Sequence, residues 1–334
     1  MSCGRPVLVL GAGGWGTALS MVLEQAGHDV RLWGHDARNV LELMKTRENT
    51  KYLPGVRLPE AIRVGPDLKA LAEGAGVVLS VVPTQFLRSV LASCREHLPP
   101  RALYVACSKG FERGTLDLPS RILASAMPAM RTAVLSGPSH AEEVARGLPA
   151  AVVAGSSEPG LAQEAQRLLQ GPRFRVYTSS DPVGVEVAGA VKNVIALAAG
   201  ISDGLGFGDN SRAALLTRGL REMTRLGTAL GARPETFAGL AGMGDLIATC
   251  TSRHSRNHAV GLRIAAGETL DAVLGSMSKV AEGVDTSRAL PTLASRLGVS
   301  MPITQEVHAV LFQSKPPREA VEALMARETR DEAG

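Results

Sequence analysis

Short apolar runs alternate with helical patterns through the first 180 residues, and this alternation restricts the possible folds more than any other feature of the sequence. Each run is rich in valine or other apolar residues and is bounded by glycine, proline or serine, which is typical of strands buried on both faces. The runs are VLVLG, VRLWG, VVLSVVP, LYVACSKG, TAVLSGPS, AAVVAG and FRVYTSS. Because helices separate the strands, we expect a doubly wound, mostly parallel sheet.

A glycine-rich loop follows the first of these runs. Gly11, Gly13 and Gly16 match G-x-G-x-x-G, between the strand and a helix that we expect to begin near Thr17. In this context the first glycine permits a tight turn, the second lets the backbone approach a pyrophosphate, and the third lets helix and strand pack closely. The phosphates would bind at the helix N-terminus, where free N–H groups and the helix dipole favour an anion. The loop therefore predicts a dinucleotide site, and a turn without a ligand is the alternative.

The second strand leaves the choice between NADP(H) and NAD(H) open. An NAD-specific site places a carboxylate at the end of this strand for the ribose 2′-hydroxyl, but the corresponding residue here is Gly34. His35 and Arg38 follow it and would suit a 2′-phosphate, which favours NADP(H). Asp36 could instead turn inward and bind the ribose, and His35 could be an ordinary exposed loop residue.

The strand pattern ends near residue 180, and the rest of the chain is predicted to be helical, with breaks at glycine and proline. A chain of 334 residues is long enough for two domains. We therefore predict an α/β protein with a Rossmann-like dinucleotide-binding domain over residues 1–185. An all-α, substrate-binding domain is predicted over residues 186–334.

Charge and hydropathy argue against nucleic-acid and membrane partners. The net charge is only +4 and the basic residues are spread along the chain, so there is no basic tail or stripe for a nucleic acid. The apolar stretch from Val183 to Ile201 is long enough to span a bilayer, but it contains Glu186, Lys192 and Asn193. We expect a buried helix and no stable membrane insertion.

The cysteines favour a reducing, cytoplasmic setting, because they are far apart and form no C-x-x-C pair. They are Cys3, Cys94, Cys107 and Cys250. Within CTSRHSRNH, one cysteine and two histidines recur every four residues, as metal ligands on a helix would. No fourth ligand is near them, so we expect no metal.

Lys192 is the most informative single residue. It lies in the middle of the apolar stretch, where a lysine is seldom buried without a partner because desolvating an ammonium group is costly. Burial lowers the pKa of a lysine toward neutrality and makes it a usable proton donor and acceptor. The alternative is a lysine whose ammonium group reaches water. Its position directly after a dinucleotide-binding domain favours the catalytic interpretation.

Two more segments lie where predicted strands end, at the edge of a parallel sheet that binds ligands. Lys109 ends LYVACSKG, and Gly137 and Ser139 end TAVLSGPS. Ser139 and Glu142 also match a capping box, which needs no ligand.

The helical half contains one polar segment, GMGDLIATCTSRHSRNHAVG. Asp245 lies between glycine and leucine at its start, and Arg256 and Asn257 follow near its end. The donor fork of an arginine suits a phosphate group, and an asparagine can add a donor beside it. The alternative is a polar loop before a helix that Ser255 caps.

Taken together, these residues resemble the NAD(P)-dependent sn-glycerol-3-phosphate dehydrogenases of bacteria. The matching stretches follow the family's order from Gly11 to about Thr286, and they include GAGGWGTAL, SGPSHAEEV, VKNVIALAAGISDGLGFGDNSRAAL, GLAGMGDLIATC, SRNHAVG and VAEGVDT. The resemblance implies that a phosphorylated triose, dihydroxyacetone phosphate, is reduced reversibly to sn-glycerol 3-phosphate for glycerophospholipid synthesis. It also implies NADP(H) or NAD(H) as cofactor, no metal and, by analogy, a homodimer.

The resemblance also implies roles for individual residues. The catalytic set would be Lys192, Lys109 and Asp245, with Lys192 as the general acid in reduction and the base in oxidation. The substrate would be held by Lys109, Gly137, Ser139, Asp245, Ser255, Arg256 and Asn257. The dinucleotide site would be formed by Gly11, Gly13, Gly14, Trp15, Gly16, His35, Lys109, Ala141, Arg256, Val280 and Glu282.

Two other functions are alternatives. A β-hydroxy acid dehydrogenase with the same two-domain plan could also use a lysine on the first helix of its second domain. Such an enzyme would not need the segment GMGDLIATC followed by the segment SRNHAVG. A non-catalytic NADP(H)-binding regulator would keep the glycine loop but would have no need of a buried lysine.

Overall fold

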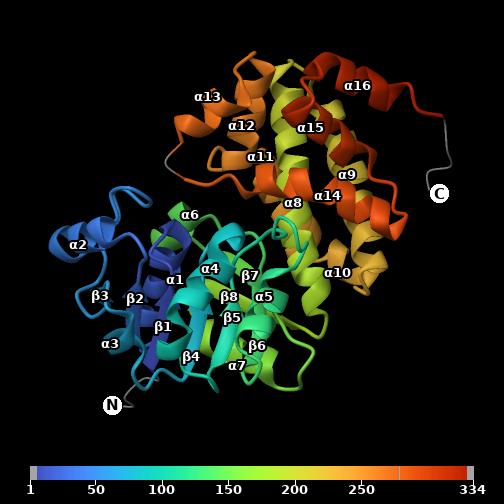
Figure 1. The fold of residues 1–334 in the computed structure, drawn as a ribbon. Coiled ribbons are helices and arrows are strands. Elements are labelled where there is room, and N and C mark those ends of the chain that lie inside the picture. Colours follow the sequence, from blue (N-terminus) through green and yellow to red (C-terminus); the bar gives the residue numbers. More distant parts are fainter. Residues whose placement is uncertain (1–5, 278, 329–334) are drawn as a thin grey trace.

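The computed structural model describes residues 6–277 and 279–328, and its first half contains an eight-stranded sheet in the order β3-β2-β1-β4-β5-β6-β7-β8 (Figure 1). The strands are β1 (Pro6–Leu10), β2 (Asp29–Trp33), β3 (Arg63–Gly65), β4 (Val77–Ser80), β5 (Leu103–Ala106), β6 (Arg131–Ser136), β7 (Ala150–Gly155) and β8 (Phe174–Ser179). All neighbouring strands are parallel except β6 and β7. The predicted doubly wound, mostly parallel sheet is confirmed.

Helices cover both faces of this sheet because successive side chains of each strand point to opposite sides. Along β1, Val7 and Val9 belong to one apolar core, whereas Leu8 and Leu10 belong to the other. The helices of this half are α1 (Gly14–Gln25), α2 (Ala37–Thr46), α3 (Leu68–Ala72), α4 (Thr84–Cys94), η1 (Arg95–His97), α5 (Pro119–Ala126), α6 (Ala141–Ala145) and α7 (Leu161–Leu169). The first core packs α1 and α7, and the second packs α4 and α5.

Two local details differ from the sequence-based expectation. Strand β3 was not predicted, because its three residues at a sheet edge are too short to form a recognisable apolar run. The helix expected near Thr17 begins at Gly14, with Gly13 as its N-cap. Glycine is a poor helix former, but here close packing overrides that preference: a Cβ on Gly16 would lie 1.9 Å from the carbonyl oxygen of Gly11.

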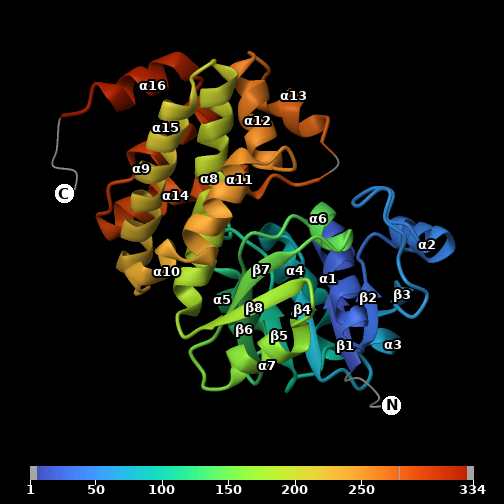
Figure 2. The same ribbon diagram turned by 180° about the vertical axis from the view of Figure 1, so that it is seen from behind.

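The second half is helical around one central helix, α8 (Pro182–Gly204), as Figures 1 and 2 show from opposite sides. Around it lie α9 (Asp209–Ala229), α10 (Pro234–Ala238), η2 (Leu240–Gly244), α11 (Asp245–Thr251), α12 (Arg256–Ala265), α13 (Leu270–Gly275), α14 (Glu282–Leu297), α15 (Pro302–Phe312) and α16 (Pro317–Met325). Helix α8 is long and apolar enough to cross a membrane, but 94% of its apolar window is buried inside the protein. It is a core helix, as expected.

Helix α8 connects the two halves. Its Val185 packs in a core beneath the sheet, whereas Val187 and the residues after it pack in a separate core of the helical half. The division at residues 185 and 186 into two domains stays a prediction.

The cysteines that the structure describes are buried and unpaired. They are Cys94, Cys107 and Cys250, while Cys3 lies outside the described residues. The four-residue repeat that includes Cys250 and His258 does not lie on one helix, because α11 ends at Thr251 and α12 begins at Arg256.

Glu222 on α9 provides a test of how the helical half is held together. Its buried carboxylate accepts hydrogen bonds from the backbone N–H groups of Ile303 (2.6 Å) and Thr304 (3.2 Å) at the start of α15. Replacing Glu222 with alanine leaves these buried donors unpaired, so we expect a loss of about 2–4 kcal/mol in the free energy of unfolding. Urea denaturation, monitored by circular dichroism, would measure this loss of free energy. The exposed Glu319→Ala should change that energy by less than ~0.5 kcal/mol, and an equally small change for Glu222→Ala would contradict the prediction.

Candidate active site

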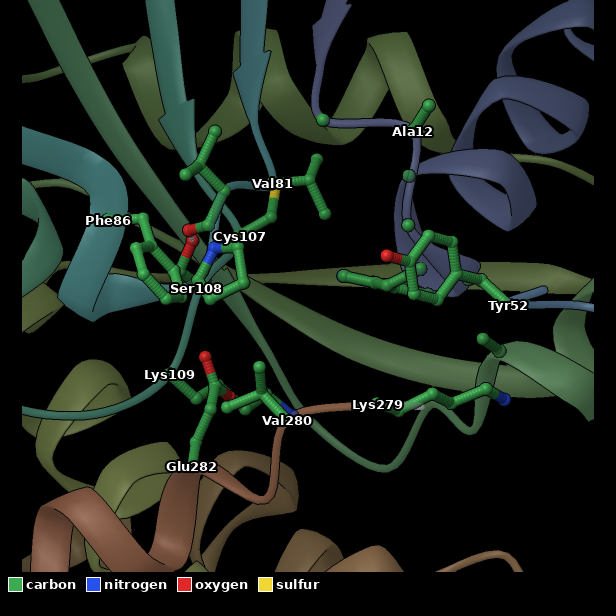
Figure 3. A pocket seen from close by; sticks show the side chains of 18 of the residues that line it. Ala12, Tyr52, Val81, Phe86, Cys107, Ser108, Lys109, Lys279, Val280 and Glu282 are labelled. Carbon is green, nitrogen blue, oxygen red and sulfur yellow. Dashed lines mark hydrogen bonds between the residues drawn. The ribbon is translucent and has the colours of Figure 1, made fainter. Parts of the chain in front are cut away.

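A cleft of about 680 Å³ lies between the sheet and the helical half, at the carboxyl ends of β1, β4 and β5 (Figure 3). Most of the predicted site residues line it: Gly11, Gly13, Gly14, Trp15, Gly16, His35, Lys109, Ser139, Ala141, Lys192, Ser255, Arg256, Asn257, Val280 and Glu282. The other two, Gly137 and Asp245, lie behind this surface and contact Lys109. The fold therefore gathers residues from both halves into one site.

The glycine loop fits closely against its neighbours except at one position. A Cβ on Gly11 would lie 2.9 Å from the carbonyl oxygen of Val81, and a Cβ on Gly14 would lie 2.8 Å from that of Tyr52. A Cβ on Gly13 would meet no atom within 4 Å, although Gly13 lines the cleft. The free N–H groups at the start of α1 lie beside this open space, so the loop has room and donors for a pyrophosphate.

The end of β2 explains why the usual ribose-binding acid is absent. A Cβ on Gly34 would lie 2.7 Å from Cγ2 of Val40 and 2.8 Å from Cβ of Ala12, so this position has no room for a side chain. His35 and Asp36 are exposed and line the cleft. The hydrogen bond from the backbone of Asn39, together with the ammonium of Lys51, lowers the pKa of Asp36.

Lys192 is buried on α8, with 5% of its surface exposed. Its Nζ donates to Asp245 and to Oγ1 of Thr249, the latter at 2.7 Å. The alternative of a lysine reaching into water is therefore wrong. Burial lowers the pKa of Lys192 to about 7; the carboxylate of Asp245 opposes this shift and the ammonium of Lys109 adds to it. Lys192 can therefore both give and take a proton near neutral pH.

Asp245 lies between two lysines at the start of α11. Its Oδ2 accepts from Nζ of Lys109 at 2.7 Å, while its Oδ1 accepts from Lys192. Burial alone would raise the pKa of Asp245, but the charges of Lys109 and Lys192 outweigh burial and lower it. Nζ of Lys109 also lies 3.3 Å from the carbonyl oxygen of Gly137. Asp245 therefore stays ionised and fixes both ammonium groups.

The turn after β6 does not form the capping box that the sequence offered as an alternative. Helix α6 begins at Ala141 with His140 as its N-cap, one residue too late for Ser139 to cap it. Oγ of Ser139 donates instead to the carbonyl oxygen of Gly137 at 2.9 Å, and Glu142 pairs with Lys279 at 2.8 Å. Ser139 thus remains at the wall of the cleft.

The start of α12 brings three predicted residues to the cleft. Ser255 caps the helix by accepting from the N–H of His258 at 3.2 Å, as expected. Arg256 is exposed and donates to the carbonyl oxygen of Val280. Asn257 is buried: its Nδ2 donates to Asn193 at 3.0 Å, and its Oδ1 accepts from the N–H of Gly283 at 3.0 Å. Asn257 therefore also holds α12 against α8 and α14.

Several lining residues were not found from the sequence. Thr249 lies one helical turn after Asp245, and this four-residue spacing could have identified it, because residues four apart share a helix face. Tyr52, Phe86 and Lys279 also line the cleft (Figure 3), but tertiary packing alone brings them there.

Comparison with known families agrees with this arrangement. Residues 6–162 match the family model of the NAD-dependent glycerol-3-phosphate dehydrogenase N-terminus, and residues 181–322 match that of the C-terminus. A glycerol-3-phosphate dehydrogenase [NAD(P)+] of Geobacillus kaustophilus is 53% identical over 329 residues, covering 98% of this chain and 96% of the relative. The chain belongs to the NAD-dependent glycerol-3-phosphate dehydrogenase family.

Other members of the family show the same likeness in sequence and structure. The enzyme of Geobacter sp. strain M21 is 51% identical, with 98% of both chains covered. The crystal structure of glycerol-3-phosphate dehydrogenase from Coxiella burnetii aligns with a TM-score of 0.93 at 39% identity, covering 97% of this chain and 99% of that one. A ketopantoate reductase from Ralstonia eutropha, at 16% identity and a TM-score of 0.62, shares the fold alone.

The open space at Gly13 gives a prediction for cofactor binding. Gly13 has an extended backbone (φ −79°, ψ −178°) that alanine adopts readily, so Gly13→Ala should keep the melting temperature within ~2 °C. Its methyl group would occupy the phosphate space, and we expect the Kd for NADPH to rise about tenfold or more. Titration calorimetry and thermal unfolding would measure both. Gly16→Ala should instead lower the melting temperature, because its Cβ collides with backbone. Unchanged NADPH affinity in Gly13→Ala would show that the phosphates bind elsewhere.

Proposed function

We propose that this protein interconverts dihydroxyacetone phosphate and sn-glycerol 3-phosphate with NADPH or NADH, and that Lys192 transfers the proton. The observation that carries the proposal is the buried ammonium of Lys192, held by Asp245 and Thr249 in the cleft that the glycine loop also lines. The product would supply glycerophospholipid synthesis.

The cleft residues fit a nicotinamide dinucleotide, which supplies the hydride when it is bound. The room at Gly13 suits its pyrophosphate. The residues that would hold the cofactor are Gly11, Gly13, Gly14, Trp15, Gly16, His35, Lys109, Ala141, Arg256, Val280 and Glu282.

The proton chemistry follows from the surroundings of Lys192. When a ketone is reduced, negative charge develops on its oxygen, and an ammonium aimed at that oxygen both stabilises the charge and supplies the proton. A pKa of about 7 lets Lys192 donate in the reduction and accept in the oxidation. Asp245 and Thr249 would keep Nζ in place, and Lys109, on the other oxygen of Asp245, would contact the substrate near the reacting carbon.

The substrate phosphate would bind at the start of α12. Arg256 is the first residue of this helix and lines the cleft with its neighbours Ser255 and Asn257. An arginine fork and the N-terminal end of a helix both favour a phosphate. Anchoring a group remote from the reacting carbon orients the ketone for reaction. Gly137 and Ser139 would contact the substrate from the turn after β6.

One spectrophotometric assay distinguishes this function from its alternatives. The absorbance of NADPH should fall when dihydroxyacetone phosphate is added, and NADH should be tested beside it. If the cofactor is oxidised only when the keto form of a β-hydroxy acid is added, the protein is the hydroxy acid dehydrogenase instead. NADPH binding with no turnover of either substrate would favour a regulator.

The role of Lys192 predicts a separation of binding from chemistry. Lys192→Ala should bind NADPH with a Kd close to that of the wild type, because the pyrophosphate site is untouched. Turnover should fall about 10²–10⁴-fold, the usual contribution of a general acid. Fluorescence titration would measure the Kd for NADPH, and initial rates would measure turnover. Near-normal turnover would refute the assignment.

The same role predicts opposite pH dependences for the two directions. Oxidation needs neutral Lys192, so its rate should rise as the pH passes upward through about 7. Reduction needs the protonated form, so its rate should fall over the same range. The carboxylate of Asp245 raises the pKa of Lys192 against the effect of burial. Asp245→Asn should therefore lower this pKa further, and the rate of reduction should begin to fall at a lower pH.

Arg256 predicts a different kinetic effect. Arg256→Ala removes the phosphate anchor but leaves Lys192 and its partners in place, so KM for dihydroxyacetone phosphate should rise about tenfold or more while kcat changes much less. Steady-state kinetics at saturating NADPH would measure it. The exposed Arg253→Ala, three residues away and not lining the cleft, is a charge-matched control. A fall in kcat with unchanged KM would contradict the assignment.

The homodimer and the cytoplasmic location stay predictions. Analytical ultracentrifugation tests the first. Buried free thiols at Cys94, Cys107 and Cys250 support a reducing compartment for the second.

A further inference from the structure

The rim of the cleft beyond β2 contains an ion pair that the proposed roles do not use. Asp36 lines the cleft two residues after Gly34, the position that has no room for a side chain. Its two oxygens have separate partners: Oδ1 accepts from the N–H of Asn39 at 3.2 Å and caps α2, while Oδ2 lies 3.2 Å from Nζ of Lys51. Only Oδ2 is free to change partner without loss of the helix cap.

Lys51 is held at this rim by the segment that covers the glycine loop. Asn49, two residues earlier, is buried and donates to the carbonyl oxygen of Ala12 at 3.0 Å and to Oγ1 of Thr17 at 2.8 Å. Nζ of Lys51 lies 5.0 Å from the ring centre of Tyr52, which lines the cleft (Figure 3). Asn49 therefore ties this segment to the phosphate loop, and the ammonium group of Lys51, which does not itself line the cleft, reaches Asp36 on the cleft wall.

We propose that Asp36 and Lys51 form an exchangeable pair that lets the site accept both NADPH and NADH. The inference rests on the proposed use of a nicotinamide dinucleotide and assigns the discrimination of its ribose 2′-group to these two residues. With NADPH, Lys51 pairs with the 2′-phosphate. With NADH, Oδ2 of Asp36 accepts from the 2′-hydroxyl.

The electrostatics of the pair support this exchange. An isolated carboxylate at the rim would repel a 2′-phosphate, and Lys51 neutralises it. The side chains of Asp36 and Lys51 are 47% and 43% exposed, and ion pairs this exposed are weak. A phosphate carries more charge than a carboxylate and would take the ammonium at little cost. His35 and Arg38 are exposed beside Asp36 and add donors for an anion.

Direct binding measurements test the proposal without turnover. The Kd values of NADPH and NADH should be measured by titration calorimetry on the whole protein. In Lys51→Ala, we expect the Kd of NADPH to rise about tenfold and that of NADH to change less than about twofold. Asp36→Asn keeps an oxygen for the helix cap but removes the charge. It should weaken NADH binding and leave NADPH binding as tight or tighter.

Controls separate local from general effects. Lys45→Ala removes the same charge from the exposed end of α2 and should leave both Kd values unchanged. Adenosine 2′,5′-bisphosphate should bind the wild type more tightly than 5′-AMP, and Lys51→Ala should abolish this difference.

An unchanged ratio of the two Kd values in Lys51→Ala would overturn the proposal, as would an equal loss for both cofactors. Failure of the proposed function gives a different result: the cofactors would bind with the expected ratio, but dihydroxyacetone phosphate would not be reduced. Reduction of dihydroxyacetone phosphate together with an unchanged ratio would overturn only the exchangeable pair.

Discussion

The buried carboxylate of Asp245 between the ammonium groups of Lys192 and Lys109 is the interaction on which the cleft depends. It joins α11, α8 and the loop after β5, so one carboxylate fixes groups from both halves of the protein. A buried charge without a partner is costly, so each lysine is held beside Asp245 and, through it, at a set position relative to the other lysine. With Lys192 neutral, Lys109 and Asp245 balance each other. Protonation of Lys192 leaves one net positive charge beside the cleft, which suits an anionic substrate.

The loop that carries Lys109 is anchored to both halves of the protein just after the lysine. Phe111, two residues later, is buried in the core of the helical half although it belongs to the sheet half of the chain. Gln85 on α4 donates to the carbonyl oxygen of Phe111 at 2.7 Å, and Arg88 on the same helix pairs with Glu112 at 2.7 Å. The lysine is therefore positioned by contacts with both halves. This explains how a loop at the carboxyl end of β5 can hold an ammonium within reach of a buried carboxylate.

The sequence predicted those features that leave a local pattern. Valine-rich runs indicated seven strands, and the glycine spacing indicated the phosphate loop, because backbone packing leaves no room for a side chain at Gly11 and Gly16 and the open space lies at Gly13. The lone lysine in an apolar helix indicated Lys192 for a similar reason: only a partner makes its burial tolerable. Tyr52 and Lys51 had no such signal. Tyr52 lines the cleft and Lys51 contacts Asp36 on its wall because Asn49 binds the glycine loop, and that contact joins segments with no shared periodicity.

The crossing of α8 and α12 shows how a packing constraint positions the chemistry. A Cβ on Gly200 would lie 2.1 Å from the carbonyl oxygen of His258, and a Cβ on Gly261 would lie 2.2 Å from that of Leu197. The two helices approach this closely only because both glycines lack side chains. The approach brings Asn257 within a 3.0 Å hydrogen bond of Asn193, the neighbour of Lys192. The first turn of α12, which would bind the phosphate, is thereby set at a fixed distance from Lys192, the proposed proton donor. A side chain at either glycine would therefore disturb the site without touching any residue that lines it.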